Sequence, residues 1–124
     1  MNSKILLSCL IMIVLISLGC NKDQGISDQD QIIGTWISVD KIDTLNFVDR
    51  TNLWRSDINM YLDHYDYQLI NDSIKIGYSG KLYIYVLPTK HRYYLNGNNL
   101  SIDFSNRLCY GFDLRVINYN RKLD

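Results

Sequence analysis

The chain has 124 residues, which is enough for one small domain and too few for two. Its 13 basic and 13 acidic residues cancel, and no basic cluster occurs, so nucleic acid is excluded as an expected partner. Every acidic residue is Asp, and the chain contains neither Glu nor Ala. Two strong helix formers are therefore missing while ten Tyr residues are present, a composition that favours strands.

The first twenty residues have the order of a secretory signal. Lys4 supplies a positive start, and residues 5–18 form an apolar run that ends at a small residue before Cys20. Residues 16–20, Ile-Ser-Leu-Gly-Cys, resemble a bacterial lipobox, in which the thiol of the first mature residue is acylated. We therefore expect a signal peptide over residues 1–19 and covalent lipid, such as palmitate, on Cys20.

Two alternatives to lipidation remain open at this stage, a transmembrane anchor and simple cleavage with release. The apolar run has about 14 residues, whereas a helix needs ~20 to span a bilayer. An acylated Cys20 and a discarded Cys9 would leave Cys109 without a partner, so we expect no internal disulfide.

Residues 20–31 are then expected to be the lipidated cysteine and a flexible tether, because this stretch is almost entirely polar. Its aspartates loosely resemble an export signal of surface lipoproteins. The expected location is the outer membrane, with the protein lipid-anchored on the periplasmic face or at the cell surface.

From residue 32 onward, short alternating apolar runs are separated by turn residues. The alternation predicts about eight strands at residues 34–40, 43–48, 61–70, 73–78, 81–87, 91–95, 100–104 and 108–117. Residues 49–59 lack a regular pattern and are predicted to be a loop or short helical turn. Pro88 ends the run before it, because proline cannot donate to a strand ladder. The sequence thus predicts an all-β, up-and-down antiparallel meander that forms a small barrel or a sandwich.

Ile33-Gly34-Thr35-Trp36 resembles the Gly-x-Trp signature that opens the first strand of the lipocalin-like superfamily. Residues 43–47 and 65–76 are similar to small lipocalin-like lipoproteins of Gram-negative bacteria. The resemblance covers residues 32–118 and implies a lipocalin-like β domain there, which leaves residues 119–124 as a C-terminal tail.

The resemblance also implies a structural contact at the closed end of the barrel. Trp36 would pack against an arginine late in the chain, with Arg115 assigned as its partner and Arg121 as the other candidate. A barrel of this length has short strands and an interior filled mostly by its own side chains, which weakens the case for a carried ligand.

No residues form a recognisable catalytic or metal-binding motif. His64 and Asp66 lie two apart on a predicted strand, which is a usable ligand spacing, but the further ligands that a site needs would have to come from other strands. Cys109 together with either histidine, His64 or His91, carries no signature of a thiol nucleophile. We therefore expect a non-catalytic protein without metal or cofactor.

Tyr83 and Tyr85 are the tentative binding residues. If Leu82, Ile84 and Val86 face the core, these tyrosines form an exposed aromatic stripe, a feature of surfaces that bind proteins or sugars. The sequence predicts a binding or interaction module of the cell envelope that takes a small apolar or sugar ligand or an envelope protein.

An inhibitor of a cell-wall hydrolase such as lysozyme is the alternative function. Residues 79–83 and 89–90 faintly resemble loop motifs of membrane-bound lysozyme inhibitors. His91 stands where those motifs carry a glycine.

Overall fold

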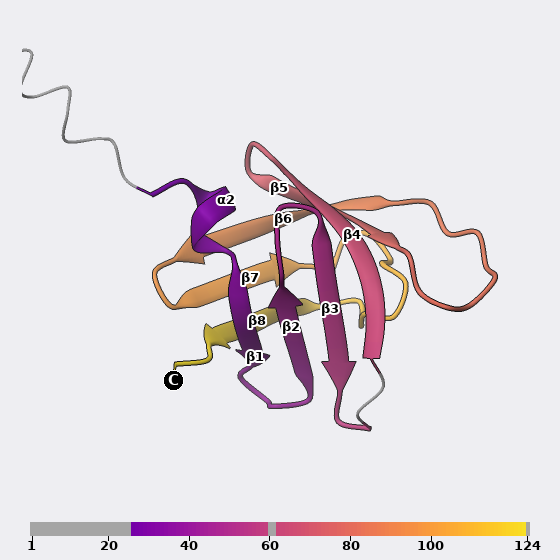
Figure 1. Ribbon diagram of the computed structural model, residues 1–124, viewed down its shortest axis with the longest axis horizontal. Helices are drawn as coiled ribbons and strands as arrows, with labels where there is room; N and C mark the ends of the chain where they lie inside the picture. The colour runs from indigo at the N-terminus through magenta and orange to yellow at the C-terminus, as the bar shows by residue number, and fades with distance from the viewer. Residues whose placement is uncertain (1–25, 60–61, 124) are drawn as a thin grey trace, which may run out of the picture.

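The computed structural model describes residues 26–59 and 62–123. Eight antiparallel strands form a closed barrel, in which each strand pairs with its neighbours in sequence and the last pairs with the first (Figure 1). The strands are β1 (Gly34–Ser38), β2 (Asp43–Phe47), β3 (Asn52–Asp57), β4 (Leu62–Ile70), β5 (Ser73–Tyr78), β6 (Thr89–Asn96), β7 (Asn99–Asp103) and β8 (Val116–Arg121). The predicted all-β meander is confirmed, and it closes into a barrel rather than a sandwich.

The barrel interior is filled by alternate side chains from all eight strands. Period-two alternation places one set of side chains inside and the other outside. The inward set is almost completely buried and includes Trp36, Leu45, Phe47, Leu53, Tyr65, Tyr67, Ile74, Ile76, Tyr93, Leu100, Ile102, Ile117 and Tyr119. Close ring contacts bind this core together, such as the edge-to-face pair of Phe47 and Tyr67 with centroids 4.8 Å apart.

The two ends of the barrel differ. A short helix, α2 (Asp28–Gln31), lies over the end where β1 begins, which we call the α2 end (Figure 1). The opposite end, which we call the mouth, carries the β1–β2, β3–β4, β5–β6 and β7–β8 connections. Within the described ranges, no helix is long and apolar enough to cross a membrane.

The loop predicted over residues 49–59 is wrong, because Asn52–Asp57 forms β3. This strand pairs with β2 on one side and with β4 on the other. Leu53 is its one buried apolar residue, so its own sequence carries little of the alternation that identifies a strand.

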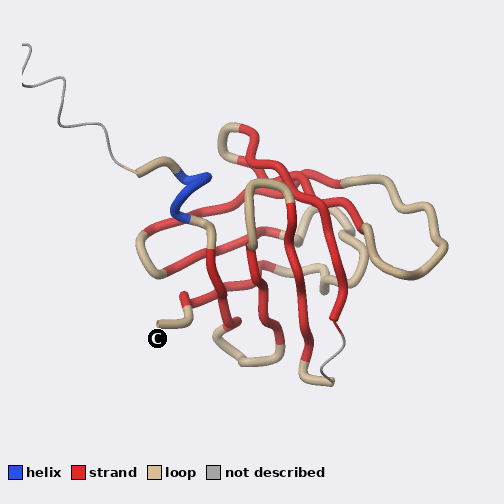
Figure 2. The backbone as a smooth tube through the Cα atoms, in the orientation of Figure 1, coloured by secondary structure: helices blue, strands red, loops and turns tan. Residues whose placement is uncertain are grey.

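The strand predicted over residues 81–87 is also absent, and this segment belongs to the long β5–β6 loop (Figure 2). β5 pairs directly with β6, from Ser73↔Arg92 to Ile76↔Thr89, so the closed barrel has no position for an additional strand between them. The segment has the pattern of a strand and lacks a neighbour with which to pair.

The last predicted strand, residues 108–117, is displaced toward the C-terminus. Residues 105–115 are a loop, and β8 runs through residue 121, so part of the predicted tail 119–124 is barrel wall. Tyr119 and Arg121 lie on the inward side of β8. Tyr119 contacts Asp43 at the mouth and Arg121 contacts Trp36 at the α2 end, so β8 in this position helps to close both ends of the barrel.

The predicted tether is wrong over residues 28–31, which form α2. Ser27 caps this helix, and Ile32 directly after it is completely buried. The predicted signal peptide 1–19, Cys20 and the first part of the tether lie outside the described residues.

Candidate functional site

The α2 end is closed around Trp36. Its indole is completely buried, and its Nε1 donates a hydrogen bond to the Ile32 carbonyl at 2.8 Å. The Arg121 guanidinium lies 4.3 Å from the centre of the indole ring and donates to the carbonyls of Ile33 and Gln31. A cation over an aromatic face is attracted by the ring quadrupole, so this contact joins β1 to β8. The hydrogen bond from Arg121 to the Gln31 carbonyl holds the end of α2 against the barrel.

The assignment of Arg115 as the partner of Trp36 is wrong, and Arg121 holds that position. Arg115 lies at the mouth, where it forms exposed ion pairs with Asp40 at 2.9 Å and Asp113 at 3.6 Å. β1 pairs with β8 in the register Trp36↔Arg121, and this register could not be determined before the strand order was known.

Two further hydrogen bonds hold α2 against inward-facing tyrosines. The Tyr93 hydroxyl donates to Asp28 Oδ2 at 2.8 Å, and Gln29 Nε2 donates to the Tyr67 hydroxyl at 3.1 Å. Polar side chains of a segment predicted to be a tether therefore satisfy tyrosine hydroxyls at the barrel end.

The mouth is closed by the β7–β8 loop. Phe112 is buried and stacks on Phe104, with ring centroids 4.5 Å apart, while its other neighbours are Tyr65 and the Arg55 guanidinium. Gly111 has a φ of +85°, and a Cβ there would lie 2.4 Å from the Tyr65 hydroxyl oxygen. Only glycine accommodates both that backbone conformation and that approach.

A buried ion pair lies beneath this loop. Arg55 Nε and Asp43 Oδ1 are 2.6 Å apart, and their side chains are 15% and 3% exposed. The Tyr119 hydroxyl donates to Asp43 Oδ2 at 3.0 Å. Burial raises the pKa of the Asp43 carboxyl above its ordinary value, although Arg55 and the Tyr119 hydrogen bond act in the opposite direction.

Sequence reasoning missed this ion pair. The alternation of β2 does place Asp43 on the same face as Leu45 and Phe47, and a charge on an apolar face signals a buried partner. The partner itself, Arg55, lies on the strand that the sequence did not predict.

Among the described residues, buried side chains fill the barrel interior. Three pockets formed by the described residues, of about 510, 310 and 210 Å³, lie along strands and loops on the outside of the barrel. α2 and the β7–β8 loop fill its two ends.

Cys109 and His91 are both buried in the core near the mouth. Burial raises the pKa of the Cys109 thiol to about 11, and burial lowers the pKa of His91. The thiol is therefore protonated at neutral pH, which removes the thiolate that a cysteine nucleophile requires. The His91 Nε2 lies 2.6 Å from the Thr89 hydroxyl.

His64 faces outward, away from His91 and Cys109. It packs against Trp54 with the two rings tilted by 38° and their centroids 4.7 Å apart, and its Nε2 lies 2.8 Å from Asn52 Oδ1. Across residues 26–59 and 62–123, no three His, Cys, Asp or Glu side chains gather closely enough to hold a metal ion.

Exposed apolar side chains surround the mouth, and all four connections there contribute. We call this set the apolar rim; it consists of Val39, Ile42, Ile58, Leu62, Leu82, Tyr83, Ile84, Tyr85, Leu87, Leu108, Leu114 and Val116. Tyr83 and Tyr85 are the most exposed of them, as the sequence predicts. They lie on a loop rather than a strand, and Leu82 and Ile84, predicted to face the core, are exposed beside them.

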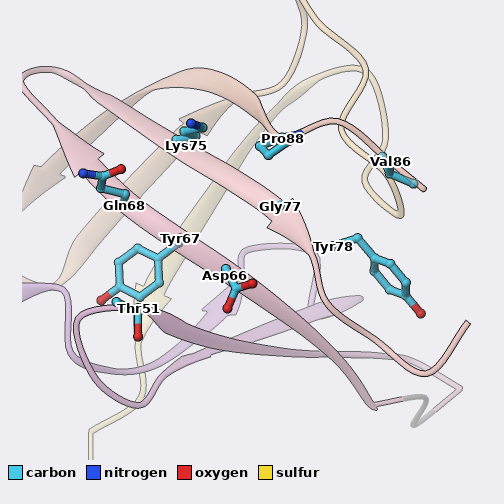
Figure 3. A pocket seen from close by; sticks show the side chains of 9 residues that line it. All are labelled: Thr51, Asp66, Tyr67, Gln68, Lys75, Gly77, Tyr78, Val86 and Pro88. Carbon is cyan, nitrogen blue, oxygen red and sulfur yellow. The ribbon is translucent and has the colours of Figure 1, made fainter. Parts of the chain in front are cut away.

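The largest of these three pockets, of about 510 Å³, adjoins the rim. It runs along β4 and β5, where Asp66, Gln68 and Lys75 face outward, and the end of the β5–β6 loop forms one side through Val86 and Pro88 (Figure 3). Gly77 contributes no side chain there, and a Cβ added to it would lie 3.3 Å from Pro88 Cγ. The pocket therefore extends the apolar rim onto a polar strand face.

Comparison with protein-family models finds no match, and comparisons with curated proteins and with solved structures find none either.

Proposed function

We propose that the chain is a lipid-anchored lipoprotein of the cell envelope whose barrel is a non-catalytic, lipocalin-like module for binding another protein. The filled interior is the observation that favours a protein-binding module over a carrier of a small apolar or sugar ligand. A filled barrel binds through its outside, and among the described residues the apolar rim is the largest set of exposed apolar side chains. Large exposed apolar patches on soluble domains are typical of interaction sites.

The orientation expected for an anchored domain supports a role for the rim. Residues 20–26 reach at most ~25 Å when fully extended, so lipid on Cys20 would keep the α2 end near the membrane. The β5–β6 loop projects from the opposite end (Figure 1). When the barrel stands on its anchored end, the rim faces away from the membrane and toward other proteins.

The Gly-x-Trp opening and its contacts support the lipocalin-like resemblance. Trp36 and Arg121 make the closed-end contact that the resemblance implies, although the arginine is not the one assigned from the sequence.

Inhibition of a cell-wall hydrolase is the second candidate. Of the two short motifs that resemble lysozyme inhibitors, residues 79–83 begin the exposed β5–β6 loop and residues 89–90 begin β6 directly after it. A loop of this kind is suited to insertion into an enzyme cleft, so the hydrolase would be one identifiable partner.

Removal of the thiol expected to carry the lipid should remove both the lipid label and the attachment to the membrane. Cys20→Ala is expected to abolish incorporation of labelled palmitate and to move the chain from the membrane fraction to the soluble fraction, because the thiol that accepts the lipid is gone. Cys109→Ala is the matched control and is expected to retain both label and membrane association. Label that persists in Cys20→Ala would refute lipidation at this residue.

Partner binding predicts a covalent adduct at the rim. Replacing Tyr83 with photoreactive benzoylphenylalanine in cells and illuminating them is expected to join the chain to a protein, because Tyr83 is fully exposed within the rim. The control is the same replacement at Tyr94, an exposed tyrosine on β6 outside the rim.

The mass of the adduct identifies the partner class. A cell-wall hydrolase would select the inhibitor function, and another envelope protein would select a general interaction module. Equal adducts from positions 83 and 94, or none from either, would refute a protein-binding role for the rim.

A further inference from the structure

The β5–β6 loop contains a segment that has the sequence pattern of a strand but no strand partner. Residues 81–87 alternate Leu82, Ile84 and Val86 with Tyr83, Tyr85 and Leu87. Within the described part of the chain, the backbone groups of residues 83–87 neither donate nor accept a hydrogen bond. Exposed apolar backbone without a hydrogen-bonding partner is a template for pairing with another strand.

The segment is complementary to itself. In an antiparallel pair centred on Ile84, each copy's Ile84 opposes the other's, Tyr83 opposes Tyr85, and Leu82 opposes Val86. One face of such a ribbon is wholly aliphatic, while the other carries aromatic pairs. Cross-strand aromatic and β-branched pairs of this type stabilise antiparallel sheets.

Charge does not oppose this pairing. Lys81 is the one charged residue of the segment, and the antiparallel arrangement places the two copies of Lys81 at opposite ends of the ribbon. Six residues at ~3.3 Å each separate them by ~20 Å, which exceeds the Debye length of ~8 Å at physiological salt.

Pairing by itself brings the exposed tyrosines of the two copies into cross-strand contact on one face of the ribbon and Leu82, Ile84 and Val86 on the other. Two strands alone are marginal, so a stable interface of ~1,200–2,000 Å² needs further side chains of the two rims to pack on the ribbon. The β1–β2, β3–β4 and β7–β8 connections supply such exposed apolar side chains, among them Val39, Ile58 and Leu108.

We infer that the partner of the apolar rim is a second copy of this chain, and that residues 81–87 of the two copies pair as antiparallel strands about Ile84. This inference rests on the proposed function in taking the rim as the binding surface, and it names the occupant.

A cysteine at the centre of the pair tests the inference. Ile84→Cys, in the full chain within its own membranes, is expected to form a disulfide-linked dimer on mild oxidation. Opposed residues in an antiparallel pair have Cα atoms ~4.5–5.5 Å apart, within the range that a disulfide spans. Ile84 is 45% exposed, so the substitution leaves the core intact.

Two variants serve as controls. Val48→Cys has similar exposure, 51%, but lies at the α2 end. Tyr83→Cys tests the register, because its counterpart in the pair is Tyr85 and the two introduced cysteines would be diagonal, ~7–8 Å apart. We expect at least ten times more dimer from Ile84→Cys than from either control, and none from the unsubstituted chain, whose Cys109 is buried.

The outcomes separate this inference from the proposed function. Equal yields from the three variants would mean random collision and would overturn the pairing. If Ile84→Cys stays monomeric while benzoylphenylalanine at position 83 joins a different protein, the second copy is refuted and the protein-binding role stands. If neither Ile84→Cys nor benzoylphenylalanine at position 83 gives an adduct, both the pairing of two copies and the protein-binding role of the rim are refuted.

Discussion

Trp36→Ala is expected to lower the free energy of unfolding by about 3–5 kcal/mol, the usual cost of deleting a large buried aromatic side chain. Trp36 is completely buried, and its removal also leaves the Arg121 guanidinium without the ring beneath it and the Ile32 carbonyl without its indole donor. Small domains are stable by only ~5–15 kcal/mol, so a large part of the total is lost. Urea unfolding followed by far-ultraviolet circular dichroism measures the change.

Trp54→Ala is the matched control for this prediction. Trp54 lies on the outer face of β3, is 37% exposed and contacts His64 across the strand pair. A cross-strand contact on an exposed face contributes roughly 1 kcal/mol or less. Equal losses from the two tryptophan variants would contradict the role of Trp36 in closing the α2 end.

Asp43→Asn is expected to destabilise the barrel by about 3 kcal/mol. The substitution keeps the shape of the side chain but leaves the Arg55 charge buried without its counter-ion, and uncompensated buried charges are costly. Because Arg55 also lies against Phe112, the β7–β8 loop is expected to loosen. Urea unfolding measures the stability, and the labelling rate of the Cys109 thiol measures the opening of the mouth.

The chain offers a control of the same chemical type. Asp40→Asn removes a charge from the pair with Arg115, but this pair is exposed to solvent, where ion pairs contribute little. Its stability and Cys109 labelling are expected to stay close to those of the unsubstituted chain. A labelling rate that does not rise in Asp43→Asn would show that the ion pair does not hold the loop.

The alternation of apolar residues was sufficient to predict the β1–β2 pair, the β4–β5 hairpin and the β6–β7 hairpin. In each, inward residues such as Leu45, Ile74 and Ile102 are apolar and their sequence neighbours are more polar. Local sequence carries the information here because each side chain is directed to one face by the backbone alone.

The alternation of apolar residues failed to predict strands where hydrogen bonding to a neighbouring strand, rather than the local sequence, decides whether a strand forms. β3 is mostly polar and exists because β2 and β4 supply hydrogen-bonding partners on both sides. Residues 81–87 have the stronger pattern, yet they form a loop because β5 pairs with β6 directly. A strand needs a neighbour, and a neighbour is a property of the whole sheet.

The sequence by itself determined the β class and the expectation of a filled interior, because these follow from composition, local alternation and chain length. Closure into a barrel, the contact of Trp36 with Arg121, and the burial of Asp43 against Arg55 were decided only by the tertiary structure. Each of these joins residues distant in sequence through the register of strand pairs, and register is set by the packing of all eight strands together.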